Sequence, residues 1–180
     1  MEIRLERMRL ADLPDLAALT GADRLFLTRT PIRDLTPLAG LTQLRVLGLR
    51  LTRVADVAPL AGLVGLESLI LSFTPVAQVA PLAGLGRLHS LYLTGSLVAD
   101  IAPLARLIGL ARLDLGGTAV TDLGPLAGMT VLESLQLSST KVIDLAPLRG
   151  LTKLRVLELG DTAVADLTPL AGLTELRRLD

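Results

Sequence analysis

His89 and Tyr92 are the chain's one histidine and one tyrosine, and they lie three positions apart in the segment RLHSLYLTGS, residues 87–96. Histidine is the commonest general base at neutral pH, and a histidine near a hydroxyl group is a candidate catalytic pair. A nucleophile would also need an oxyanion hole, and no local segment supplies one with an activated serine. We therefore predict that this chain is not an enzyme.

Aspartate is the second residue type that could carry chemistry, because it recurs every 22 residues. Stacked repeats would place these carboxylates about 5 Å apart, and calcium binds hard oxygen ligands of this kind. Each calcium site would need several more oxygens, whereas the neighbouring residues are Leu, Val, Ala and Pro. We predict no metal and no cofactor, and expect each carboxylate to accept backbone N–H groups at the start of a helical turn. The aspartates are Asp12, Asp34, Asp56, Asp100, Asp122, Asp144 and Asp166, with Gln78 as the exception.

The composition narrows the class of protein. Hydrophobic residues make up 51% of the 180 residues, so the chain is expected to fold. Lys and Arg total 18, as do Asp and Glu, and this balance does not favour nucleic acid as a partner. Residues 1–7 are too charged for a signal peptide, and the uncharged segment 68–86 contains Pro75, Pro81 and Gln78. We therefore expect no membrane insertion and a cytoplasmic location.

The elements that position these residues follow from an internal repeat of 22 residues, such as DLTPLAGLTQLRVLGLRLTRVA from Asp34. Repeat positions are numbered here from 1, the aspartate, to 22. Apolar residues occupy positions 2, 5, 8, 11, 14, 16 and 21, and a Pro-Leu-Ala-Gly segment usually occupies positions 4 to 7. We predict one domain, 1–180, made of a partial unit 1–11, the repeats 12–33, 34–55, 56–77, 78–99, 100–121, 122–143 and 144–165, and a partial unit 166–180.

Each repeat is predicted to contain a short strand and a short helical turn. Positions 14 and 16 are apolar around one variable residue, as in a strand with one buried face. Proline at the start and glycine after the end suit a single helical or 3₁₀ turn. A lone repeat cannot bury its leucines, but stacked repeats share one continuous core.

The pattern L-x-x-L-x-x-L-x-L-x-x-T-x-V-x-D-L-x-P-L-x-G-L resembles the leucine-rich repeat of bacterial internalin-like proteins. This resemblance implies an α/β solenoid, a right-handed horseshoe with a parallel β-sheet on the concave face and short helical or 3₁₀ turns on the convex side, which binds proteins. The family's usual asparagine at position 19 is replaced by a hydroxyl, which we expect to partner backbone groups of the turn. These residues are Thr30, Thr52, Thr74, Ser96, Thr118, Thr140 and Thr162.

The repeats differ from one another at positions 12, 13, 15, 17 and 18. These positions lie on or beside the outward face of the strands, where a ligand could bind. All three aromatic residues occupy such positions, and an exposed apolar patch on a sheet often marks an interaction site. We predict a protein or peptide ligand on this face; the alternative is that these side chains shield one another or fold over the turns. The predicted binding residues are Phe26, Val46, Arg50, Leu51, Ile70, Phe73, His89, Tyr92, Arg112, Asp114, Glu158 and Asp161.

Charge is predicted to change sign along the same face, which would orient a partner. The units that begin at positions 12, 34 and 56 carry Arg24, Arg29, Arg45 and Arg50 against Asp23 and Glu67, a net charge of +2. The units that begin at positions 100, 122 and 144 carry Arg112 and Arg155 against Asp114, Glu133, Glu158 and Asp161, a net charge of −2.

The last unit offers a second interpretation. Leu173, Leu176 and Leu179 belong to an incomplete repeat, and solenoids need a polar cap to stay soluble. We expect a further segment, a fused domain or a second copy to cover these leucines. In the last case the chain would be a self-associating scaffold.

Overall fold

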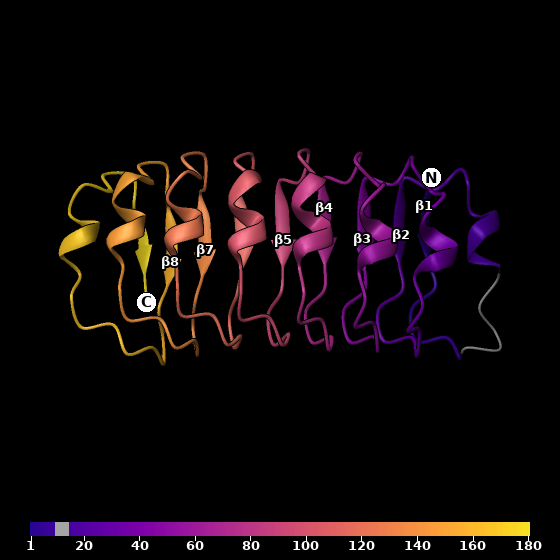
Figure 1. Ribbon diagram of the computed structural model, residues 1–180, viewed down its shortest axis with the longest axis horizontal. Helices are drawn as coiled ribbons and strands as arrows, with labels where there is room; N and C mark the ends of the chain where they lie inside the picture. The colour runs from indigo at the N-terminus through magenta and orange to yellow at the C-terminus, as the bar shows by residue number, and fades with distance from the viewer. Residues whose placement is uncertain (10–14) are drawn as a thin grey trace.

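The computed structural model describes residues 1–9 and 15–180, so Asp12 lies outside the described residues. The described residues form one curved stack of repeats (Figure 1). They contain nine strands of two or three residues in one parallel sheet, ordered as in the sequence. The strands are β1 (Glu2–Arg4), β2 (Arg24–Phe26), β3 (Val46–Gly48), β4 (Ser68–Ile70), β5 (Ser90–Tyr92), β6 (Arg112–Asp114), β7 (Ser134–Gln136), β8 (Val156–Glu158) and β9 (Arg178–Leu179).

Strand register follows the repeat. Leu47 of β3 lies opposite Leu69 of β4, and the same positions are paired throughout the sheet. Hydrogen bonding continues beyond the three strand residues, since the Arg29 N–H donates to the Arg50 carbonyl at 2.9 Å. Identical positions of successive repeats therefore form rows across the sheet.

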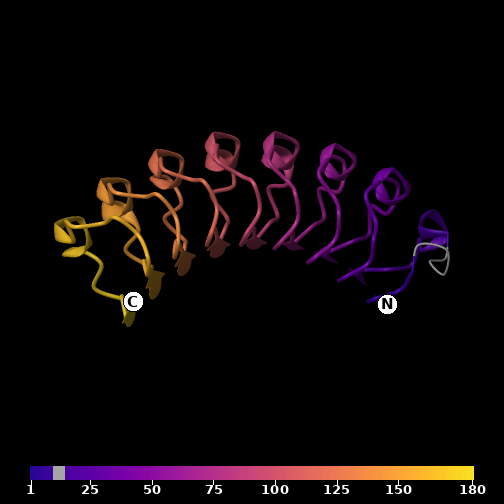
Figure 2. The ribbon, with the colours of Figure 1, turned by 90° about the horizontal axis from the view of Figure 1, so that it is seen from below.

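A 3₁₀ helix follows each of the strands β1 to β8. Proline stands at the first or second position of most of these helices, where its missing N–H costs nothing. Figure 2 shows the helices on the outer side of an arc and the strands on its inner side, as predicted. The helices are η2 (Leu16–Ala18), η3 (Thr36–Leu38), η4 (Ala58–Leu60), η5 (Ala80–Gly84), η6 (Ala102–Arg106), η7 (Gly124–Leu126), η8 (Ala146–Gly150) and η9 (Thr168–Leu170).

The core lies between the sheet and the helices. Leu38 of η3 and Leu47 of β3 both have no exposed surface, and the equivalent leucines form one cluster along the stack. Burying a leucine side chain contributes about 1.5–3 kcal/mol, and each repeat obtains this only from its neighbours. The repeat therefore dictates the architecture.

Segment 68–86 and the C-terminal leucines, both singled out in the sequence, are described by the structure. No helix among the described residues is long and apolar enough to cross a bilayer, and residues 68–86 contain β4 and η5. At the C-terminal end, Leu173 is buried in the core cluster and Leu176 is half-buried, so of the three leucines only Leu179 is exposed. Leu179 and Leu167 are the exposed side chains there, at 45% and 49%.

Candidate functional site

The predicted binding residues lie on the strands, which form the inner side of the arc, or directly beside them in the chain. The loop after each strand has a constant backbone conformation. Repeat position 18 has a left-handed backbone in every repeat, with φ between 56° and 64°. An L-residue in this conformation costs about 1–2 kcal/mol, whereas glycine adopts it freely. Sequence reasoning missed this constraint, although two glycines at position 18 were its signal. The residues are Arg7, Arg29, Leu51, Phe73, Gly95, Gly117, Ser139 and Asp161.

Phe73 is held between residues of the two adjacent repeats. The Arg50 guanidinium carbon lies 4.9 Å from the centroid of the Phe73 ring. The ring also lies against Gly95 of the next repeat, where an added Cβ would come within 2.7 Å of it. Phe73 is nevertheless 44% exposed. The ring is therefore fixed in place and still available to a partner.

Phe26 repeats this arrangement near the N-terminus. The Arg4 guanidinium carbon lies 4.7 Å from its ring centroid, and a Cβ added at Gly48 would lie 2.5 Å from the ring. Phe26 is half-buried, as is Tyr92, so these two aromatics are less exposed than predicted. Each phenylalanine ring lies against a glycine of the next repeat, and a larger residue at that position would overlap the ring.

The apolar members of the predicted site share one region of the sheet. Ile70 and Tyr92 are direct neighbours in the register of β4 and β5, and both are half-buried. Val46 is half-buried on β3, while Leu51 is 37% exposed in the following loop. We call these residues the apolar patch: Phe26, Val46, Leu51, Ile70, Phe73 and Tyr92.

A hollow of about 310 Å³ continues from the apolar patch toward the C-terminal repeats. Phe73, Asp114 and Glu158 contribute to its lining. Gly95, Gly116 and Gly117 also line it, and their lack of side chains leaves room for the hollow. The Asp114 carboxylate accepts the Gly116 N–H at 3.0 Å, so it is oriented on the sheet. Sequence reasoning did not find this hollow, which arises from glycines in adjacent repeats.

The predicted change of charge sign is partly neutralised within the chain. Arg45 forms an ion pair with Glu67 at 2.9 Å, and Arg155 contacts Glu133 at 3.8 Å. The Arg178 guanidinium lies 3.2 Å from the Glu158 carboxylate. Such exposed pairs contribute little to stability, about 0–1 kcal/mol. They do reduce the charge that these residues offer to a partner.

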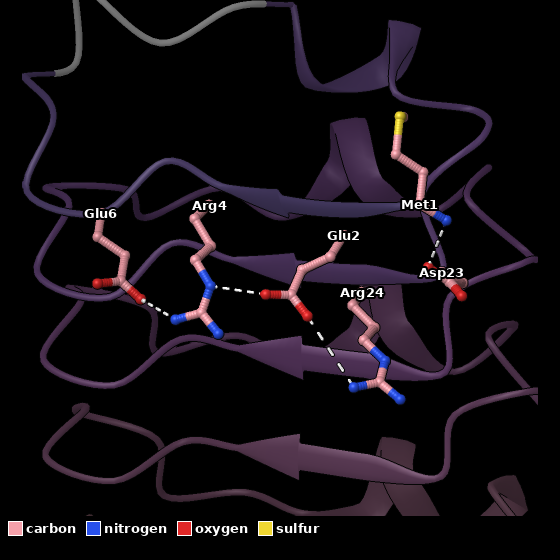
Figure 3. A network of polar contacts seen from close by, with 6 residues as sticks. All are labelled: Met1, Glu2, Arg4, Glu6, Asp23 and Arg24. Carbon is pink, nitrogen blue, oxygen red and sulfur yellow. Dashed lines mark hydrogen bonds and ion pairs between the residues drawn. The ribbon is translucent and has the colours of Figure 1, made fainter.

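The N-terminal edge of the sheet carries its own network of charges (Figure 3). Arg4 donates to Glu2 at 2.7 Å and lies 3.7 Å from Glu6. The N-terminal ammonium of Met1 donates to Asp23 at 2.6 Å, and this hydrogen bond lowers the pKa of the Asp23 carboxyl. Charges on an edge strand disfavour pairing with another sheet.

The remaining site residues are spread around the patch. His89 is exposed, and its carbonyl accepts N–H groups of Ala111 and Arg112, both at 2.9 Å, so its described contacts belong to the sheet. Arg112 is exposed on β6. Asp161 accepts the Ser139 hydroxyl at 3.4 Å.

The recurrent aspartates and hydroxyls have structural roles, as predicted. Asp34 Oδ1 accepts the Thr36 N–H at 2.8 Å, and hydrogen bonds from Thr36 lower the pKa of Asp34. Thr118 Oγ1 donates to the Leu115 carbonyl at 2.6 Å, and most other position-19 threonines do the same. Ser96 differs, because its buried hydroxyl has no partner among the described residues. Residues 1–9 and 15–180 contain no group of three His, Cys, Asp or Glu side chains that could hold a metal.

Comparisons with known proteins agree with this architecture. No family model matches the chain, and a search of curated proteins found no match either. Two solved internalins of Listeria monocytogenes, inlF and internalin C2 (inlC2), are each 36% identical to it over 92% of this chain, with TM-scores of 0.89 and 0.90. The aligned region spans 49% of the inlF chain and 73% of the inlC2 chain.

A leucine-rich-repeat protein of Leptospira interrogans superposes on the whole of this chain and 48% of its own, with a TM-score of 0.92. Its sequence identity is 21%, so this likeness supports the fold alone. The shared repeat, the parallel sheet with 3₁₀ turns and the two Listeria structures lead to one conclusion. The chain belongs to the bacterial internalin-like leucine-rich-repeat family.

Proposed function

We propose that residues 1–180 form a non-catalytic recognition module that binds a protein or peptide on the concave face. The apolar patch is the observation that supports this proposal. Phe73 is 44% exposed and Leu51 is 37% exposed, and neither is covered by another layer of the chain. Uncovered apolar side chains grouped on one face are typical of interaction sites, and aromatics beside arginine are frequent at binding hot spots.

The packing of the Phe73 ring also supports binding. The ring lies against Arg50 and Gly95 of the two adjacent repeats and is still exposed. The hollow beside the ring would take a side chain of the ligand. Asp114 offers it a carboxylate that forms no ion pair with another described residue. The cytoplasmic location expected from the sequence stays a prediction.

The proposal is tested with peptides selected from a random library for binding to the unmodified chain. Phe73→Asp combined with Tyr92→Ala is expected to weaken the selected peptides by at least about tenfold, because it removes the two aromatic anchors. Aspartate already occupies the left-handed position 18 at Asp161, so Phe73→Asp suits the backbone. Binding is measured by isothermal titration calorimetry and folding by thermal unfolding.

The matched control is Val64→Asp combined with Ile108→Ala. These apolar side chains are 61% and 63% exposed and lie outside the concave face. The control is expected to keep the affinity of the unmodified chain. Equal binding of the peptides by the Phe73/Tyr92 variant and by the control would rule out the apolar patch as the binding site.

A self-associating scaffold is the second candidate. Leu179 and Leu167 are exposed, and with Leu159 and Val164 they line a hollow of about 240 Å³ at the C-terminal end of the sheet. A second copy docked there would bury these side chains. Sedimentation equilibrium distinguishes the two candidates, because a monomer at high concentration excludes assembly through this end.

A further inference from the structure

Six arginines gather on one rim of the stack, in the loops that follow the first three strands. These loops are residues 6–9, 28–33 and 50–55, all within repeat positions 17 to 22, and Glu6 is their one acidic residue, so their net charge is +5. The same positions of all later repeats contain only Lys141 and Asp161 as charged residues. We call the cluster the arginine rim: Arg7, Arg9, Arg29, Arg33, Arg50 and Arg53, all exposed.

The three loops lie side by side. The Arg7 N–H donates to the Thr28 carbonyl at 2.9 Å, and the Arg29 N–H donates to the Arg50 carbonyl at 2.9 Å. The Arg53 N–H donates to the Ile32 carbonyl at 3.0 Å. Arg7 and Arg29 occupy the same position of successive repeats, so their backbones lie about one strand spacing of 4.8 Å apart.

Little in the chain compensates this charge. Glu6 lies 3.7 Å from Arg4, and the Asp34 carboxylate accepts the Thr36 N–H. Arg7, Arg29 and Arg53 form no ion pair with another described residue.

Arg7 and Arg29 also have a left-handed backbone, with φ of 60° at both residues. Strain of this kind and repulsion between neighbouring like charges both destabilise the folded chain. The folded chain gains no described ion pair from these residues in return, as expected of groups that meet an external anion.

We propose that the arginine rim binds an extended acidic segment of a partner protein. Two strand spacings separate the first of the three loops from the third, roughly 10 Å, which matches about three extended residues. In such a segment alternate side chains point the same way about 7 Å apart, so Asp or Glu at every second residue would face the rim. The planar guanidinium group donates paired hydrogen bonds to a carboxylate, which favours this ligand.

The neighbouring aromatics favour an acidic peptide over single-stranded nucleic acid. Nucleic-acid binding surfaces of that kind combine positive charge with aromatic rings on which bases stack. Here the Arg4 guanidinium lies over the Phe26 ring and the Arg50 guanidinium lies over the Phe73 ring. One face of each phenylalanine ring is therefore already occupied by an arginine and is not open to a base.

The test measures fluorescence anisotropy of a short labelled peptide of alternating Glu and Gly. The test variant is Arg7→Gly with Arg29→Gly and Arg53→Ala, in which glycine relaxes the two left-handed residues rather than straining them. We expect at least about tenfold weaker binding and a smaller loss of affinity with added salt. Arg33→Ala with Arg53→Ala, which leaves the left-handed residues unchanged, is expected to weaken binding in the same direction.

The control variant is Arg87→Ala with Arg106→Ala and Arg149→Ala, which removes the same charge from exposed residues outside the rim. It is expected to bind the peptide as the unmodified chain does. Equal weakening by the control would reduce the effect to net charge and overturn the proposal. Tighter binding of oligouridine RNA or of phosphatidylserine vesicles than of the peptide would also overturn it. The rim can bind an acidic segment whether or not the apolar patch binds a ligand, because the two tests change different residues.

Discussion

At the scale of single residues, the glycines beside the apolar patch have different reasons for lacking a side chain. An added Cβ at Gly116 would meet ordinary contacts, the shortest at 3.4 Å. Gly117 also has space, with 3.7 Å to its nearest neighbour, but its φ is 64°. Gly95 combines a φ of 63° with the Phe73 ring 2.7 Å from an added Cβ. Substitution by alanine would therefore cause neither effect at Gly116, backbone strain alone at Gly117, and both strain and steric overlap at Gly95.

We predict that substitution by alanine destabilises the fold least at Gly116, more at Gly117 and most at Gly95. Gly117→Ala should lower the free energy of unfolding by about 1–2 kcal/mol through the left-handed backbone, and Gly95→Ala by more. Gly116→Ala serves as the control. Urea unfolding measures each value, and the excess cost at Gly95 should shrink when Phe73 is also replaced by alanine. Equal costs at Gly116 and Gly117 would contradict the role given to position 18.

At the scale of the repeat element, the hydroxyl at position 19 closes the turn after each strand. Thr118 donates to the Leu115 carbonyl at 2.6 Å, whereas the Ser96 hydroxyl is buried without a described partner. We predict that Thr118→Val costs about 1 kcal/mol of unfolding free energy, while Ser96→Ala costs less than about half of that. Thermal unfolding of both variants measures the difference. A larger loss for Ser96→Ala would show that its hydroxyl is satisfied after all.

Much of this element was predictable from the sequence, and the reason is the constancy of the repeat. Leucine at positions 14 and 16 and proline in the helical turn recur in nearly every unit, so strand, helix and core follow directly. The left-handed residue at position 18 was not predicted, because Arg29, Leu51 and Phe73 obscure the preference that Gly95 and Gly117 reveal.

At the scale of the whole molecule, the site depends on contacts between residues 22 positions apart. The repeat register predicted which strands are neighbours, and so it placed Ile70 beside Tyr92. The register did not predict that Arg50 would lie over the Phe73 ring or that Arg178 would pair with Glu158. A long side chain can reach several neighbouring residues, and the register does not determine which one it contacts. Those choices decide which charges and rings remain available on the concave face.

Hydroxyl-radical footprinting of the chain with a selected peptide ligand tests the central proposal, a concave binding face, most directly. Phe73 and Tyr92 are expected to become several-fold less reactive when the peptide is bound. Ile108 and Leu97, both 63% exposed, should react as they do in the free chain. Protection of Ile108, Leu97 or Leu179 with no change at Phe73 and Tyr92 would contradict binding on the concave face.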